Sequence, residues 1–248
     1  MQLSILPGSA LLQAAFYGLA ALIVIAAGLL LKRAAHHVGD SPQQAAALQR
    51  RYYIGASIWL LVVSAAAYSG ALIPRAGPPL PFVILLVSIL ALGLAIARSR
   101  IGDRLARGLP LAILVGFQGF RFPLELAMHR AHTEGLMPAQ MSYSGRNFDI
   151  LTGITAIVLA VALAVRPLPR WIVWVWNVFG LLLLANILAV AIASTPVFAY
   201  FGPDRLNVFV MWMPYTLLPA VMVLAAWAGH LIIFRVLSSR AASTPDLR

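Results

Sequence analysis

The amino-acid sequence predicts an all-α, polytopic integral membrane protein with seven transmembrane helices. Of the 248 residues, 62% are hydrophobic and only 10% are charged, and the mean hydropathy is +0.91. Soluble domains carry roughly 25% charged residues, so the composition excludes an ordinary soluble fold. Seven apolar runs have about the length of 20 residues that a helix needs to cross a bilayer. The ten-residue alternation typical of a membrane β-barrel is absent from the sequence.

Each predicted span is bounded by charged or turn-forming residues. The first follows Pro7-Gly8-Ser9, the second ends at Pro74-Arg75, and the fourth is the most polar. The loops between spans are too short to fold alone, so we expect residues 1–237 to form one domain. The segment 238–248 is predicted to be a short disordered cytoplasmic tail. The seven predicted spans are 10–31, 52–73, 80–97, 108–132, 148–165, 171–193 and 208–234.

Basic residues are distributed unequally between the two sides of these spans. The sequence has 18 Lys and Arg against 7 Asp and Glu. Thirteen of the eighteen fall in the loops 32–51, 98–107 and 166–170 and in the C-terminal segment. Because cytoplasmic loops carry the excess of Lys and Arg, we expect the N-terminus outside and the C-terminus in the cytoplasm. The same asymmetry accounts for the net charge of +11, so no nucleic-acid partner is predicted.

Residue usage narrows the compartment and the chemistry. Cysteine is absent, which excludes disulfides and thiolate metal sites. All basic residues except Lys32 are Arg, and with the abundance of Ala this usage is typical of a GC-rich bacterial genome. We therefore expect the bacterial cytoplasmic membrane. A covalently bound retinal is excluded, because it would need a lysine in the last span.

The fourth span carries a stripe of ionisable residues. Arg121, Glu125, His129 and His132 follow one another at steps of four, four and three, which keeps them on one helical face. An ionised side chain within a span costs about 2.5–3.5 kcal/mol on insertion scales, so each is expected to have a partner or a function. At a spacing of four residues, Arg121 and Glu125 are expected to neutralise one another.

An outward-facing polar pocket is predicted where the stripe meets the neighbouring spans. By the predicted topology the stripe rises toward the extracytoplasmic surface, where the fifth span begins and the seventh span starts. A pocket between the fourth, fifth and seventh helices could bind a polar or anionic molecule, or exchange protons. Its predicted residues are Arg121, Glu125, His129, His132, Arg146, Asn147, Asp149, Trp212 and Tyr215.

A divalent metal site is an alternative use of the same region. Glu125 and His132 are seven residues apart, a helical rise of about 10.5 Å, so one ion with bonds of about 2 Å cannot take Glu125 together with both histidines. The better predicted ligand set combines the two histidines with carboxylates from adjacent segments. That set is His129, His132, Glu134 and Asp149. No other cofactor is predicted.

Structural roles are open for several of these polar residues. Asn147 and Asp149 suit the first turn of the fifth helix, where capping and negative charge are favoured. Asn177 and Asn186, with Gly180, suit close interhelical hydrogen bonds. His230, which the predicted span places near the cytoplasmic end of the seventh helix, suits the same kind of structural role.

Three classes of function are compatible with the sequence. The favoured one is a carrier or membrane sensor that handles a small molecule or protons through the predicted pocket. The second is a membrane-embedded, metal-dependent enzyme acting on a lipid-phase substrate. The third is an interaction subunit that docks another membrane protein through its polar stripe. No P-loop, HExxH or GxSxG motif is present, so nucleotide hydrolysis and the common hydrolase mechanisms lack their parts.

Overall fold

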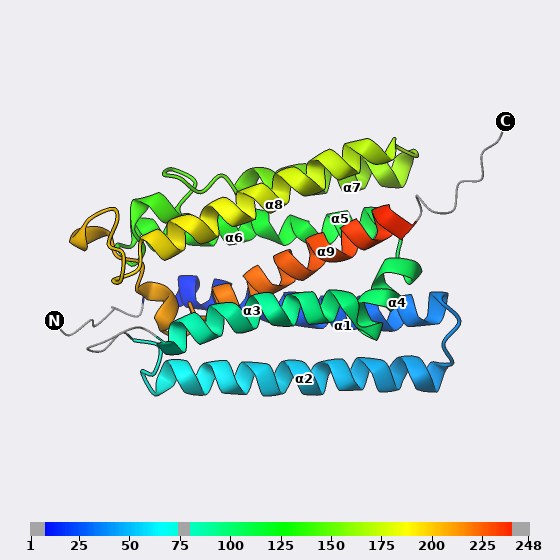
Figure 1. The fold of residues 1–248 in the computed structure, drawn as a ribbon, viewed down its shortest axis with the longest axis horizontal. Helices are drawn as coiled ribbons and strands as arrows, with labels where there is room; N and C mark the ends of the chain where they lie inside the picture. The colour runs from blue at the N-terminus through cyan, green and yellow to red at the C-terminus, as the bar shows by residue number, and fades with distance from the viewer. Residues whose placement is uncertain (1–7, 74–79, 240–248) are drawn as a thin grey trace.

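The regular secondary structure of the described residues is entirely helical. A computed structural model describes residues 8–73 and 80–239, and 79% of the structure is helical, with no strand among the described residues. Figure 1 shows the long helices running roughly along one axis, with short loops at their two ends. The predicted all-α class is confirmed. Most of the predicted disordered tail lies outside the described residues.

Five of the described helices are long and apolar enough to cross a membrane. Each overlaps a predicted span: the first, third, fourth, sixth and seventh. Large apolar side chains on their outer faces, such as Leu22, Ile84 and Leu182, are more than half exposed. Lipid-facing side chains of this kind are expected of a membrane protein. The five helices are Ala10–His37, Leu80–Arg98, Leu111–Thr133, Arg170–Ala193 and Leu218–Ser239.

The predicted second and fifth spans are also helical, but they differ from these five. Helix α2 (Pro42–Tyr68) begins ten residues before the predicted start, because Ser41 and Gln44 form a capping box and Pro42 opens the first turn. The predicted loop 32–51 is therefore mostly helix. Helix α7 (Ile150–Val165) is apolar but has only 16 residues.

Two further boundaries differ from the prediction. The segment 98–107, predicted as a loop, contains helix α4 (Arg100–Gly108), which is capped by Ser99. The seventh helix starts ten residues later than predicted, because a short 3₁₀ helix, η4 (Phe209–Met211), and a turn precede it. It begins as a π-helical segment, η5 (Leu218–Val223), and continues as α9 (Leu224–Ser239). The remaining long helices are α1 (Ala10–His37), α3 (Leu80–Arg98) and α8 (Arg170–Ala193).

The fourth span consists of three consecutive helical segments that run without a break. A short α5 (Leu111–Phe117) passes through one 3₁₀ turn, η1 (Gln118–Phe120), into α6 (Arg121–Thr133). A 3₁₀ turn within a longer helix often marks a functional position. Here it directly precedes Arg121.

The helices pack in an order that brings the polar fourth span into the interior. Helices α5 and α6 pack against α7, while α9 packs against α3, α5 and α8. Helix α2 packs mainly against α1 and lies at the edge of the bundle, as Figure 1 shows. One large buried apolar cluster joins α1, α3, α6, α8 and η5, and a smaller one joins α4, α5, α7 and α9. The polar residues described next lie within this packing.

Candidate functional site

Arg121 forms a buried ion pair at the junction of α6 and α7. Its side chain is 1% exposed. The Nε atom donates to Oδ2 of Asp149 at 2.6 Å, and Nη2 donates to the other carboxylate oxygen, so the pair is bidentate. The expected pairing of Arg121 with Glu125 is wrong: the helix that packs across from Arg121 supplies a carboxylate that both guanidinium nitrogens can reach.

Glu125 is bound by an amide instead of a cation. Asn147 donates through Nδ2 to Oε2 of Glu125 at 2.7 Å and to the Met141 carbonyl at 3.0 Å. The Oδ1 atom of Asn147 accepts from the backbone N–H of Asp149 at 3.0 Å. Glu125 is 1% exposed and Asn147 is fully buried. Within the described part of the chain, Glu125 forms no ion pair.

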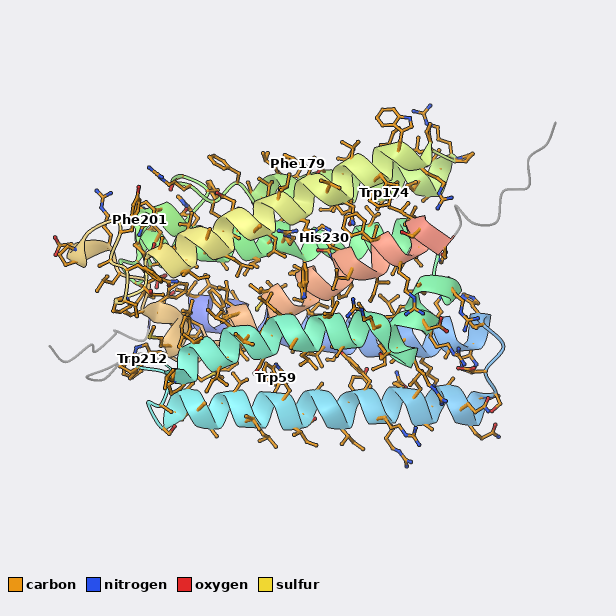
Figure 2. The ribbon with its side chains drawn as sticks, viewed as in Figure 1. Trp59, Trp174, Phe179, Phe201, Trp212 and His230 are labelled. Carbon is orange, nitrogen blue, oxygen red and sulfur yellow. The ribbon has the colours of Figure 1, made fainter. Side chains whose placement is uncertain are left out.

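His230 of α9 extends the network on the other side of Arg121. Its Nε2 lies 2.8 Å from Nη1 of Arg121, and its Nδ1 lies 2.8 Å from Oδ1 of Asn177. A guanidinium only donates, so Nε2 accepts, and Nδ1 carries the proton that it donates to Asn177. The imidazole is therefore held as one neutral tautomer. Figure 2 shows His230 in the interior of the bundle.

A glycine on α8 makes room for these contacts. A Cβ atom at Gly180 would lie 2.7 Å from the His230 ring and 2.8 Å from the Thr152 methyl group. The carbonyl of Gly180 also lies 3.5 Å from two Arg121 nitrogens. Asn177 donates to the His230 carbonyl at 3.1 Å, which confirms the predicted interhelical hydrogen bond beside a close helix approach.

Sequence reasoning missed the membership of His230 and Asn177 in this network. The prediction placed His230 near the cytoplasmic end because it started the seventh span at residue 208. The helix starts at Leu218, so His230 lies in its middle, at the level of Arg121. The available signal was the occurrence of Asn177 and His230 as polar residues within apolar spans.

The two histidines of α6 lie outside this network and form a separate surface cluster. His129 Nδ1 lies 2.9 Å from the Ser142 hydroxyl, and its ring stacks on Tyr143 with centroids 4.4 Å apart. His132 Nδ1 lies 3.1 Å from the Met137 carbonyl, so it donates there. The two imidazole centroids are 6.2 Å apart.

Glu134 forms yet another set of contacts, at the N-terminal end of α1. Its carboxylate accepts from the Ser9 backbone N–H at 2.7 Å, from the Ser9 hydroxyl at 2.6 Å and from Arg130 Nε at 2.5 Å. The Ser9 hydroxyl and then Arg130 hold the pKa of Glu134 at about 2. Asp149 is bound to Arg121, so the predicted ligands are not brought together. Among the described residues no group of three or more His, Asp or Glu is placed to hold a metal ion, and the geometry lends the metal-dependent enzyme no support.

The other predicted pocket residues are dispersed. Arg146 is exposed, and its guanidinium lies 5.2 Å from the centroid of the Phe201 ring. Tyr215 is 1% exposed and packs against Phe16 with ring centroids 5.1 Å apart. Trp212 is half-buried against the apolar core. Of the nine residues predicted for the pocket, Arg121, Glu125, Asn147 and Asp149 form one enclosed network, and the rest lie elsewhere.

We call the set Glu125, Asn147, Asp149, Arg121, His230 and Asn177 the buried polar network. Hydrogen bonds link its members through four helices, α6, α7, α8 and α9, and every member is at most 4% exposed. Arg121 and Asp149 balance each other in charge, and His230 is neutral. Glu125 is the member for which taking up a proton removes an uncompensated buried charge.

Comparisons with known proteins do not identify the function of this site. No family model matches the chain, and neither the curated proteins nor the solved structures contain a match.

Proposed function

We propose that the chain is a multi-pass protein of the bacterial cytoplasmic membrane that handles protons, as a carrier or a sensor, through the buried polar network. We further propose that α2 and α7 join the five candidate spans to make seven, with the N-terminus outside. The thirteen basic residues on one side of the spans support this orientation.

One observation carries the proposal: Glu125 is a buried carboxyl whose side-chain partner is an amide. Ionisable residues within membrane spans mark proton relays and ligand sites, because an isolated charge there is costly. A purely structural carboxylate would be expected to pair with a cation, as Asp149 does with Arg121. Glu125 instead accepts a hydrogen bond from Asn147. The Asn147 amide can donate to the Glu125 carboxyl group in either of its protonation states.

The rest of the network couples Glu125 to other polar groups through hydrogen bonds. Asn147 bonds both Glu125 and the backbone of Asp149, and Arg121 joins Asp149 to His230. His230 is the imidazole member of the network, a side chain that can exist in a neutral or a protonated form. Its neutral form accepts from Arg121, so protonation of His230 would break that hydrogen bond and alter the contact between α6 and α9.

Proton flux into proteoliposomes tests the proposal. Purified protein is reconstituted with an internal pH-sensitive dye, and a potassium gradient with valinomycin supplies the driving potential. The wild type is expected to acidify the lumen faster than empty liposomes, and Glu125→Gln is expected to remove that excess. Glutamine can still accept a hydrogen bond from Asn147, so the fold is expected to persist.

The matched control is Asp204→Asn, which makes the same chemical change at an exposed carboxyl. It is expected to leave the flux unchanged. A wild-type flux no greater than that of empty liposomes contradicts the carrier form of the proposal, and a Glu125→Gln flux equal to wild type contradicts the role of Glu125.

A further inference from the structure

A separate cavity of about 300 Å³ lies on the opposite side of α9 from the buried polar network. Helices α1, α2, α3, α4, α5 and α9 line it, almost entirely with aliphatic side chains such as Leu92, Ile96 and Leu105. Its volume falls at the lower end of the range of about 300–1,000 Å³ found for ligand sites. A space with such walls suits a hydrocarbon chain and offers little to a polar solute.

The cavity opens along α2. Arg51 and Gly55 are the exposed residues of its lining, and both belong to this helix. Further along α2, Trp59 also lines the cavity. Its Nε1 donates to the Ala220 carbonyl at 2.9 Å, a hydrogen bond that joins α2 to η5. Figure 2 shows Trp59 on α2. The opening therefore connects the cavity with the membrane surroundings at the edge of the bundle.

Arg51 is a cation at this opening that has no partner among the described residues. The other polar lining groups are used, since the Tyr52 hydroxyl donates to the Val24 carbonyl at 3.2 Å and the Trp59 indole bonds Ala220. Arg51 forms no ion pair or hydrogen bond within the described part of the chain. The Arg51 guanidinium is therefore free to bind an anion from outside the protein.

The carboxylates at this end of the bundle are already bound by other arginines. Asp40 accepts two hydrogen bonds of 2.8 Å from Arg104. Asp103 pairs with Arg104, with Arg107 and, at 2.9 Å, with Arg235. These pairs join α4 to α9 and to the loop after α1, and they leave the charge of Arg51 uncompensated.

We propose that the cavity holds one acyl chain of an anionic phospholipid from the bilayer, with the lipid phosphate bound by Arg51. The guanidinium fork matches phosphate oxygens in a bidentate geometry, and basic pockets between membrane helices bind anionic headgroups. The apolar side chains that line the cavity pack against the lipid acyl chain. No residue of this site belongs to the buried polar network. A failed test of the lipid site therefore does not contradict the proposed proton function, and the reverse also holds.

Native mass spectrometry of the full-length protein in a mild detergent tests the site. The probes are phosphatidylglycerol and phosphatidylcholine with identical acyl chains. We expect one retained phosphatidylglycerol, preferred about fivefold, since a basic residue at the membrane surface contributes about 1 kcal/mol toward anionic lipid. Arg51→Gln is expected to equalise the two lipids. Glycerol phosphate, a headgroup without chains, is expected not to compete.

Two glycines give a matched test of the cavity itself. An added Cβ atom at Gly55 or at Gly18 meets nothing within 4 Å, but only Gly55 lines the cavity. We expect Gly55→Phe to fill the cavity and abolish retention of both lipids, while Gly18→Phe retains phosphatidylglycerol. Retention by Gly55→Phe, an equal preference for the two lipids in the wild type, or competition by glycerol phosphate overturns the proposal.

Discussion

The ion pair between Arg121 and Asp149 gives the most quantitative prediction of the structure. We consider Arg121→Met, Asp149→Asn and the double variant as a thermodynamic cycle. Each single variant leaves one buried charge without its partner, whereas the double variant leaves neither charge. The free energy of unfolding should therefore not fall additively.

The contacts of the pair set the expected size of the effect. Without the guanidinium, Asp149 is 4% exposed and keeps one side-chain hydrogen bond to its carboxylate, from Thr152 at 3.4 Å. His230 also loses the donor to its Nε2. Removing one partner of a buried ion pair costs about 3–5 kcal/mol. We expect each single variant to lose about that amount and the double variant to lose no more than either, a coupling energy of about 3 kcal/mol.

Equilibrium unfolding in mixed micelles with increasing SDS measures these free energies, with far-UV circular dichroism as the signal. Gln13, a polar residue of α1 outside the network, supplies a background control through Gln13→Met. Losses of the two single variants that add to within about 0.5 kcal/mol in the double variant would refute the reasoning. Such additivity would mean that Arg121 and Asp149 are each stabilised by other groups.

Two further predictions concern the end of the bundle where α1 begins and the packing of α6 on α7. A hydrogen bond from the Ser9 hydroxyl is the main cause that lowers the pKa of Glu134 from 4.5 to about 2, so the stabilisation it gives is complete above about pH 4.5 and disappears as the pH falls to about 2. Thermal unfolding across this range should show an acid-dependent loss that Glu134→Gln lacks, and identical pH profiles would contradict this. A Cβ atom at Gly153 would collide with the backbone of Phe122. Gly153→Ala should therefore lose about 1–3 kcal/mol, while Gly18→Ala, which has open space, should be neutral or slightly stabilising; equal effects in the same SDS assay would exclude a close backbone contact.

The sequence was sufficient for the fold class and for most span positions. A run of about 20 apolar residues is the direct requirement for a membrane-spanning helix. For this reason five predicted spans coincide with helices that are long and apolar enough to cross a membrane. The boundaries were harder, because hydropathy does not sense helix ends. The early start of α2 is set by the capping box of Ser41 and Gln44, a local signal that can be found in the sequence. The late start of the last helix has a weaker signal, Pro219 in its first turn, and no side-chain cap.

The candidate site was predicted in part. Helical spacing placed Arg121 and Glu125 on one face, and the structure buries both. Spacing along one helix cannot say which helix lies opposite, so the partners Asp149 and Asn147 were assigned to capping or to a pocket instead of to this pair. The contact that decides the pairing is the close approach of α7 to α6 at Gly153, which only the folded chain shows.

The buried polar network and the cavity use different faces of the same helix. Adjacent residues on an α-helix point about 100° apart, and on α9 Gly229 lines the cavity while His230 bonds Arg121. The fourth span is shared along its length, since Phe117 lines the cavity and Arg121, four residues further on, lies in the network. Both proposed sites therefore act on the packing of these two helices without sharing a side chain. Filling the cavity by Gly55→Phe should leave the Glu125-dependent proton flux intact if the two helices are rigid, and a changed flux would show that occupancy of the cavity shifts α9 against Arg121.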